Sequence, residues 1–175
     1  LSAVMSERGA AQQRLAESER NYRLVVENQT ELVVRLDADG RVAYASRAGV
    51  LGHYPRSVTR RADMVPTPVG HYTVSKVFGE ALAYSYAHQH EMECVCVRIG
   101  NFSLERDLPT HPHHLSHGDC VRVFEQALTH PGVRYAVVFG VSGSNWPLYD
   151  LEHGRAAIGY WPRDFAYVPE DQWDK

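Results

Sequence analysis

Short apolar runs separated by polar stretches recur along the chain and predict β-strands. These runs span residues 31–36, 41–46, 92–99 and 135–140. The first two flank Asp39-Gly40, and two strand-like runs around Asp-Gly are the strongest short-range signal for a β-hairpin. The run at 92–99 is largely apolar along its length, which is typical of a buried parallel strand.

Helices are predicted between these strands. The longest, residues 71–88, repeats apolar or small residues at the spacing of one helical face, so we expect this face to pack on the core. These positions are Val74, Phe78, Ala81, Leu82 and Ser85. Further helices are predicted after Gly118-Asp119 and over 147–158. Because strands alternate with helices, we expect an α/β fold with a parallel sheet.

Composition narrows the class of protein. The chain has 175 residues, 44% of them hydrophobic, which suits one domain of ordinary size with a real core. Its net charge of −3 gives no reason to expect a nucleic acid or an anionic membrane as a partner. No apolar run approaches the roughly 18 residues that cross a bilayer. Segment 1–8 lacks a signal-peptide core, and three cysteines favour a reducing compartment, so we expect a cytoplasmic protein.

Tyr72 and Lys76 are the first candidates for chemistry. They lie four residues apart near the start of the predicted 71–88 helix, so their side chains share one face. A phenol with an ordinary pKa of about 10 is a poor base at neutral pH, but a neighbouring ammonium favours the phenolate. The same ammonium can donate to the hydroxyls of a bound ribose. Any amphipathic helix can also hold the two residues at this spacing by chance.

The residues around this pair resemble a known family. Residues 72–83 are similar to the catalytic helix of extended short-chain dehydrogenases/reductases, the NAD-dependent epimerase/dehydratase family, and most of all to its uronate-dehydrogenase-like branch. Similar segments occur in the family's order and with near-family spacing over about residues 41–168. They are 44–55, 98–102, 114–119, 137–142 and 158–164. The resemblance implies a Rossmann-type parallel sheet with flanking helices.

The resemblance also implies catalytic roles. Tyr72 matches the tyrosine that exchanges a proton with a sugar hydroxyl or carbonyl. Lys76 matches the lysine that supports this tyrosine and holds the nicotinamide ribose of NAD or NADP, while hydride passes to or from the cofactor. The family's strand end carries two adjacent serines, the second catalytic, whereas here Ser46 is followed by Arg47. Either Ser46 supplies the hydroxyl from a shifted position, or only the Tyr/Lys pair remains.

Two further positions concern the substrate, which the resemblance implies to be a sugar or a sugar acid. Asn101 matches a substrate-lining position of the family. Uronate-type members also use an arginine of the following loop to hold the substrate carboxylate, chemistry that suits a guanidinium. In the loop 102–111 only Arg106 is available, and it is out of register with the family's arginine. Asn101 and Arg106 are therefore the predicted substrate contacts. The expected substrate is a sugar or a sugar acid, and the shifted register of Arg106 counts against a uronate.

A group of histidines raises the question of a metal. They are His111, His113, His114 and His117. Their spacing fits no standard zinc pattern, and no cysteine accompanies them. We therefore expect no metal here, but a solvated or substrate-facing loop.

One feature of the family is missing. A dinucleotide fold needs a glycine-rich turn after its first strand, where backbone N–H groups and a helix N-terminus receive the pyrophosphate. Neither Gly-x-x-Gly-x-x-Gly nor Gly-x-Gly-x-x-Gly occurs in the sequence. We therefore expect residues 41–175 to form the C-terminal part of the family's fold, a partial Rossmann-type sheet without the glycine-rich βαβ half. Because this leaves a strand edge and an apolar face uncovered, we expect the strand at 31–36 to cover part of the edge and a homodimer to be feasible.

The segment before residue 41 resembles a different family. Residues 6–29 are polar and helix-prone, which predicts a solvated helix or a short connector. Residues 19–28, followed by 36–42, are similar to the opening of a PAS sensory domain, in which a signalling helix precedes a first hairpin. We therefore interpret residues 1–40 as a PAS-like helix and hairpin. The two resemblances overlap between about residues 41 and 58.

Three hypotheses for function follow. The first is an NAD(P)-dependent oxidoreductase or epimerase that acts on a sugar or sugar acid by Tyr/Lys proton transfer, or that is inactive because its dinucleotide-binding half is missing. The second is a PAS-type sensory or dimerisation module fused to an inert reductase remnant. The third is a gene fragment without independent activity. Binding of NAD separates the first from the other two.

Overall fold

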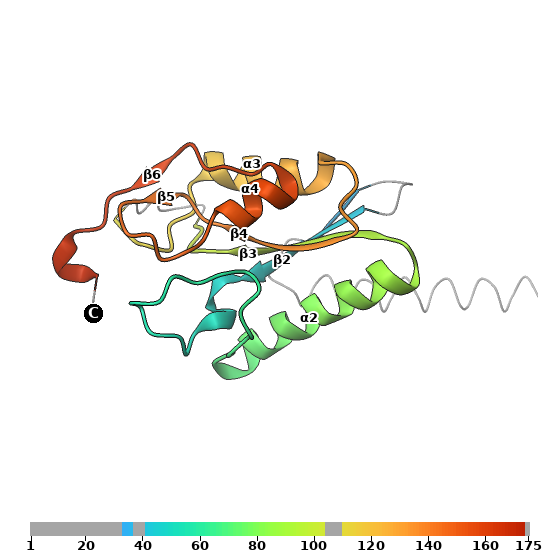
Figure 1. Ribbon diagram of the computed structural model, residues 1–175, viewed down its shortest axis with the longest axis horizontal. Coiled ribbons are helices and arrows are strands. Elements are labelled where there is room, and N and C mark those ends of the chain that lie inside the picture. The colour runs from blue at the N-terminus through green and yellow to red at the C-terminus, as the bar shows by residue number, and fades with distance from the viewer. Residues whose placement is uncertain (1–32, 37–40, 104–109, 174–175) are drawn as a thin grey trace, which may run out of the picture. The chain divides into compact units, whose positions relative to one another are not determined.

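The computed structural model describes residues 33–36, 41–103 and 110–173 and shows an α/β arrangement (Figure 1). The predicted helix at 6–29 and Asp39-Gly40 lie outside the described residues. Along the chain the elements are β1 (Val33–Leu36), β2 (Arg41–Arg47), the 3-10 helix η1 (Ala48–Leu51), α2 (Gly70–Gln89), β3 (Glu93–Ile99), α3 (His117–Thr129), β4 (Tyr135–Gly140), β5 (Gly143–Ser144), α4 (Glu152–Ile158), β6 (Phe165–Ala166) and η2 (Glu170–Gln172).

The main sheet confirms the predicted strands. It has four strands in the order β1-β2-β3-β4. β1 pairs antiparallel with β2, which confirms the hairpin, and β1 covers the outer edge of β2 as expected. β2, β3 and β4 are parallel, with Arg47 opposite Ile99 and Ile99 opposite Gly140, so their carboxyl ends meet at one edge. The division of the chain at residues 40 and 41 stays a prediction.

Helices cover both faces of the parallel strands. α2 packs on one face of β2 and β3, whereas α3 and α4 pack on the opposite face (Figure 1). β3 lies between two parallel neighbours and is buried along most of its length. This three-layer arrangement is the one that a continuously apolar parallel strand requires. Within the described residues, no helix is both long and apolar enough to cross a bilayer.

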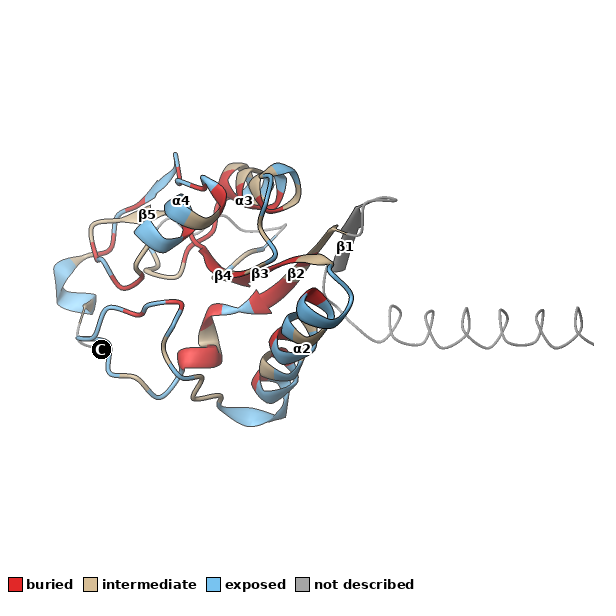
Figure 2. Cartoon of the chain, turned by 45° about the vertical axis from the view of Figure 1, so that its right-hand side comes forward, coloured by how far each residue is buried: buried red, intermediate tan, exposed pale blue. Residues whose placement is uncertain are grey.

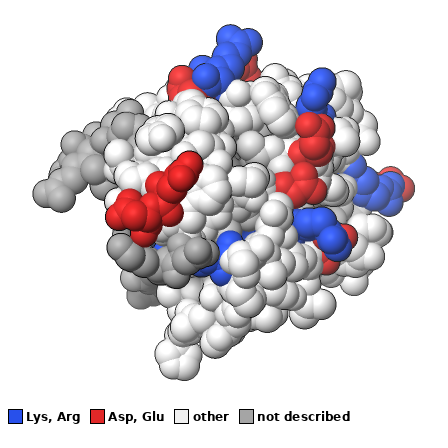
Figure 3. Space-filling model, turned by 60° about the vertical axis from the view of Figure 1, so that its left-hand side comes forward, with Lys and Arg blue, Asp and Glu red and all other residues white. Residues whose placement is uncertain are grey.

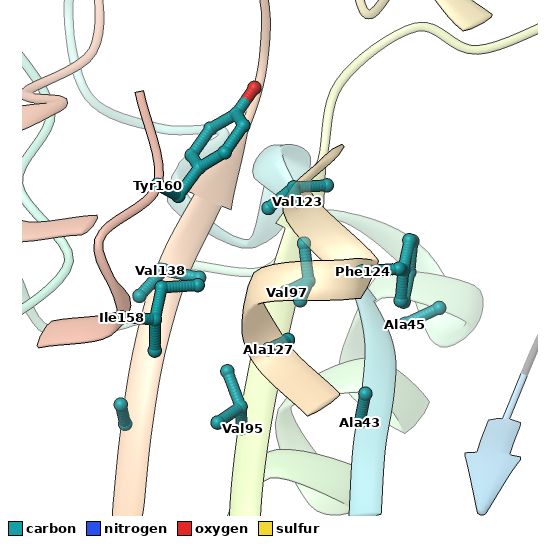
Figure 4. Packing of buried hydrophobic residues seen from close by; sticks show 11 residues of the cluster. Ala43, Ala45, Val95, Val97, Val123, Phe124, Ala127, Val138, Ile158 and Tyr160 are labelled. Carbon is teal, nitrogen blue, oxygen red and sulfur yellow. The ribbon is translucent and has the colours of Figure 1, made fainter. Parts of the chain in front are cut away.

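The main hydrophobic core lies between the sheet and α3. Side chains from one face of the strands meet one face of α3, with the last residue of α4 and Tyr160 completing the cluster (Figure 4). Full burial of each larger side chain contributes roughly 1.5–3 kcal/mol. The buried members are Ala43, Ala45, Val95, Val97, Val123, Phe124, Ala127, Ala136, Val138, Ile158 and Tyr160.

A second cluster lies where the loops gather beyond the strand ends. It joins η1 to the end of β4 and to the segment 146–149. Its largest fully buried members are Val50, Leu51, Phe139, Val141, Leu148 and Val168. The loop between η1 and α2 is therefore anchored by apolar side chains beyond the carboxyl ends of the strands.

The prediction about which face of α2 packs on the core is wrong. Val74, Phe78 and Leu82 are 50%, 67% and 46% exposed. The buried positions of this helix are Thr73, Lys76, Glu80 and Ala87. The exposed outer face and the buried inner face of α2 are both visible in Figure 2. α2 thus turns polar side chains toward the sheet.

The physical reason lies in the strand face opposite α2. Ser46 and Arg98 stand on that face and are buried, and both bond to Glu80. A buried charge requires a charged and hydrogen-bonded partner, and this requirement outweighs the burial of a few apolar groups on a surface helix. Partners of this kind are tertiary and leave no periodic signal along α2.

The C-terminal region differs from its prediction in detail. The helix expected over 147–158 begins only at Glu152, where the side chain of Asp150 accepts from the Glu152 N–H at 3.0 Å. Leu148 and Tyr149 are buried before the helix starts. The tail after Pro162 contains the short elements β6 and η2.

Candidate active site

Tyr72 and Lys76 lie at the carboxyl edge of the parallel strands. α2 connects β2 to the parallel strand β3, so it runs back along the sheet and begins near the end of β2. In open α/β sheets, ligands bind outside this edge. Tyr72 stands in the first turn of α2 and is 49% exposed, whereas Lys76, one turn further, is 3% exposed.

The Lys76 ammonium lies between two phenol rings. Its Nζ is 5.4 Å from the centroid of the Tyr72 ring and 5.3 Å from that of the Tyr44 ring. An ammonium at this distance is attracted by the negative face of each ring. Burial lowers the pKa of Lys76, and burial above all raises the pKa of Tyr44 to about 12. The structure thus brings the two predicted catalytic residues together, one buried and one open to solvent.

Arg47 is a neighbour of Tyr72 that sequence reasoning did not select. It ends β2, and its Cζ lies 5.5 Å from the centroid of the Tyr72 ring. It occupies the place in the sequence where the resemblance implies the catalytic serine. The sequence shows the departure from the serine pair and leaves open a shifted or an absent hydroxyl, but its pattern does not indicate that Arg47 lies beside Tyr72.

Ser46 has a different environment. It is buried, and its Oγ donates to Glu80 Oε1 at 2.6 Å. Its hydroxyl is thus committed to a carboxylate of the helix. A direct role of Ser46 toward a substrate stays a prediction.

A buried ion pair holds α2 on the sheet. Arg98 Nε and Nη2 donate to the two carboxylate oxygens of Glu80 at 2.9 and 2.8 Å. Arg98 Nη1 donates to the carbonyl of Ala62 at 3.1 Å, and the Tyr135 hydroxyl donates to the Glu80 carbonyl at 3.2 Å. Glu80 is one turn beyond Lys76 on the same side of the helix. The pair therefore fixes the height and rotation of the helix that carries Tyr72.

The predicted substrate contacts are described only in part. Asn101 continues β3 through an isolated bridge to His114, and its Nδ2 lies 3.2 Å from His111 Nδ1. Since Asn101 follows the end of β3, it stands at the same sheet edge as Arg47. Arg106 lies outside the described residues.

The histidines divide among different environments. The His113 Nδ1 atom is hydrogen-bonded to the Tyr149 hydroxyl, and burial together with nearby cations lowers the pKa of His113 to about 4. His114 is buried, whereas His117 contacts the Ser103 carbonyl from an exposed position. In the described part of the chain, no three histidine, cysteine or acidic residues group as metal ligands.

A hollow of about 630 Å³ lies away from the predicted site residues, none of which lines it. It separates the segment 141–152 from the segment 161–165, and Trp146 and Trp161 stand on its walls. Both acidic and basic side chains reach it, including Arg61 and Asp150. Its size does not identify it as the active site, because the predicted chemistry lies at Tyr72.

A parallel α/β sheet with an exposed tyrosine and a buried lysine one helical turn apart at its carboxyl edge defines a short-chain reductase type of protein. The chain belongs to the NAD dependent epimerase/dehydratase family, whose sequence model matches residues 4–145. This match begins within the segment interpreted as PAS-like, and that interpretation stays a prediction.

Similar proteins include uronate dehydrogenase from Agrobacterium fabrum, 33% identical over 136 residues, which cover 75% of this chain and 50% of that protein. Among solved structures, glucuronic acid dehydrogenase from Chromohalobacter salexigens is 30% identical with a TM-score of 0.66, over 74% of this chain and 48% of that one. A tyrosine-to-alanine mutant of uronate dehydrogenase from Agrobacterium tumefaciens, complexed with NAD, is 31% identical with a TM-score of 0.66, over 72% and 48%. The chain thus spans about half the length of these relatives.

Proposed function

We propose that this chain supplies the proton-transfer side of an NAD-dependent oxidoreductase that acts on a sugar acid. One observation carries the proposal: the exposed phenol of Tyr72 stands beside the buried ammonium of Lys76 at the carboxyl edge of the sheet. The uronate and glucuronic acid dehydrogenases among its relatives support the substrate class. The relative complexed with NAD supports the cofactor, with NAD favoured over NADP.

Lys76 and Tyr72 suit contact with the nicotinamide-ribose end of the cofactor. Lys76, held against the Tyr72 ring, is placed to donate to ribose hydroxyls beside that phenol. The 175 residues contain no glycine-rich turn for a pyrophosphate, so we assign only the nicotinamide-ribose contact to this chain. When bound, the cofactor would accept a hydride as NAD or supply one as NADH.

Tyr72 is the residue that exchanges a proton with the substrate. In the oxidative direction, the Tyr72 phenolate oxygen takes the proton of the substrate hydroxyl as the carbon beside it loses a hydride. Lys76 and Arg47 place positive charges 5.4 and 5.5 Å from the centroid of the ring that exchanges this proton. In the reductive direction, Tyr72 returns the proton to the carbonyl oxygen. A positioned acid-base group of this kind contributes roughly 10²–10⁴-fold in rate.

Binding of NAD to the purified chain, measured by calorimetry, tests the proposal. We expect Lys76→Met to weaken binding, because methionine fills the buried space but cannot donate to a ribose. Arg155→Met is the matched control: Arg155 also lies against an aromatic ring, 5.5 Å from the Trp161 centroid, but on α4. Absence of NAD binding, or equal effects of the two substitutions, contradicts the assignment and leaves the PAS-type module with an inert remnant as the better hypothesis.

The same proposal includes a homodimer. The outward face of α2 exposes the apolar side chains of Val74, Phe78 and Leu82 along one side of the helix. Pairing of this face with the same face of a second copy would bury it in a symmetric contact. We expect Phe78→Glu to shift sedimentation toward monomer, whereas Val121→Glu, at an exposed position of α3, leaves the mass unchanged. A monomeric native chain would contradict this part of the proposal.

We also place the activity in the cytoplasm. Cys94, Cys96 and Cys120 are free thiols, and none of them forms a disulfide within the described residues. Free, largely buried thiols suit a reducing compartment. Fractionation of the source cells, with the protein recovered alongside cytoplasmic markers, is the expected result.

A further inference from the structure

Three arginines lie around the pair formed by His113 and Tyr149. Arg47 ends β2, and Arg56 and Arg60 follow in the loop between η1 and α2. Arg60 Cζ lies 5.8 Å from the Tyr149 ring centroid, and within the described residues the positive charges of the three guanidinium groups act on both His113 and Tyr149. We call Arg47, Arg56 and Arg60 the arginine cluster.

Among the described residues, no ion pair balances the positive charge of this cluster. None of the three arginines takes part in an ion pair in the described portion of the chain, whereas Arg41, Arg61, Arg98 and Arg122 all do. On the face drawn in Figure 3, most basic side chains lie beside acidic ones. Like charges that gather without a counter-charge repel one another, so an arrangement of this kind is retained at a cost.

Arg60 is the buried member of the arginine cluster. It is 5% exposed and lies 5.8 Å from the centroid of the Tyr149 ring. Its Nη2 donates to the Tyr54 carbonyl at 3.0 Å and its Nε to the Leu51 carbonyl at 3.5 Å, but its Nη1 is buried without a hydrogen-bond partner. A buried polar group without a partner is rare in folded proteins and calls for a physical explanation. A negatively charged ligand bound at the exposed arginines of the cluster would offset the buried charge of Arg60 through space.

The cluster borders the proton-transfer site. Arg47 belongs to both, since its guanidinium lies 5.5 Å from the Tyr72 ring centroid while it also acts on His113. Arg47 and Arg56 are exposed and can contact a ligand directly, whereas buried Arg60 adds fixed positive charge behind them. A ligand that reaches Tyr72 with one end therefore meets the arginine cluster with another part.

We propose that the arginine cluster binds the anionic group of the substrate, a carboxylate or a phosphate, while the reacting hydroxyl or carbonyl faces Tyr72. The planar guanidinium donates in pairs to either group, which makes arginine the usual residue for such recognition. Only the orientation toward Tyr72 rests on the proposed function. The anion-binding site itself stands on the arginines, and it assigns to them the work for which the sequence suggested Arg106.

Calorimetric titration of the full chain without NAD tests the proposal. The probes are glucuronate, glucose 6-phosphate and uncharged glucose. We expect at least one of the two anionic sugars to bind and glucose to bind more weakly, and the stronger of the two identifies the anion. Arg47→Gln should weaken that binding roughly 10- to 100-fold, as loss of a charge-assisted hydrogen bond does. Arg134→Gln is the matched control, since Arg134 is an exposed arginine before β4, at the amino end of the strands.

Two results overturn the proposal: glucose binds as tightly as the anionic sugars, or Arg47→Gln binds them like the native chain. Arg60→Gln is a second variant, expected to weaken anion binding if it folds. Because Arg47 is exposed, its replacement keeps the test valid even if the Arg60 variant fails to fold. Anion binding without any NAD binding refutes the proposed function while it supports the arginine cluster, so the two failures are distinguishable.

Discussion

Replacement of Glu80 by methionine is the sharpest test of how the catalytic helix is held. The Glu80 and Arg98 side chains are 6% and 3% exposed, and their contact at 2.8 Å is a buried ion pair. Ser46 adds a hydrogen bond to the same carboxylate at 2.6 Å. Glu80→Met removes the carboxylate but leaves the Arg98 charge in the interior.

The expected loss in the free energy of unfolding is about 3–5 kcal/mol, because the remaining charge is left buried without a partner. Domains of this kind are stable by only about 5–15 kcal/mol, so the effect is large. Ser46→Ala, which removes one hydrogen bond to a charged group, should cost about 1.5–3 kcal/mol. Replacement of both Glu80 and Arg98 by methionine should recover much of the loss, because no unpaired charge remains.

Urea unfolding followed by circular dichroism measures these differences. Glu93→Met is the control: the Glu93 and Arg41 side chains are paired but 30% and 26% exposed, and solvent screening limits the expected change to below about 1 kcal/mol. If Glu80→Met is as mild as Glu93→Met, or if the double replacement is no more stable than the single one, the reasoning about the buried pair is refuted.

Three further predictions concern packing and ionisation. The pKa of His113 is held at about 4, below its ordinary 6.5, so between these pH values the unfolded chain binds a proton that the folded chain does not. The free energy of unfolding should therefore fall by roughly 2 kcal/mol from pH 7 to pH 5. In urea unfolding, His113→Gln should reduce this dependence on pH. Gly79→Ala should lower the melting temperature, because the added Cβ meets the Tyr44 hydroxyl and ring; this clash outweighs the preference of about 1 kcal/mol for alanine over glycine in a helix. Adding Tyr44→Leu to the Gly79→Ala chain should restore part of the lost melting temperature. Burial raises the pKa of the Cys96 thiol, so a thiol reagent should label it quickly only in urea; rapid labelling of the native chain would count against this packing.

The elements with a strong local signal were predictable from the sequence. The hairpin strands, the buried strand β3 and the helices α2 and α3 follow from residue pattern, turn residues and helix signals. The placement of Tyr72 and Lys76 on one side of α2 follows from their spacing alone. In each case the information lies within a few neighbouring residues.

The features that escaped prediction depend on contacts between distant segments. The orientation of α2 is set by Glu80 and Arg98, 18 residues apart and on different elements, and it opposes the hydrophobic pattern of the helix. The arginine cluster similarly combines the end of β2 with a loop that has no periodicity. Arg47 and Arg60 therefore looked like ordinary polar residues until the fold brought them beside Tyr72 and Tyr149.

The most direct test of proton transfer is the formation of NADH from NAD and glucuronate by the purified chain, compared among three forms. Tyr72→Phe removes one hydroxyl from the start of α2, and Tyr84→Phe removes the same group three turns later from another exposed tyrosine of that helix. We expect native turnover to persist in Tyr84→Phe and to fall by roughly 10²-fold or more in Tyr72→Phe. Equal turnover in the two variants would contradict the role of Tyr72.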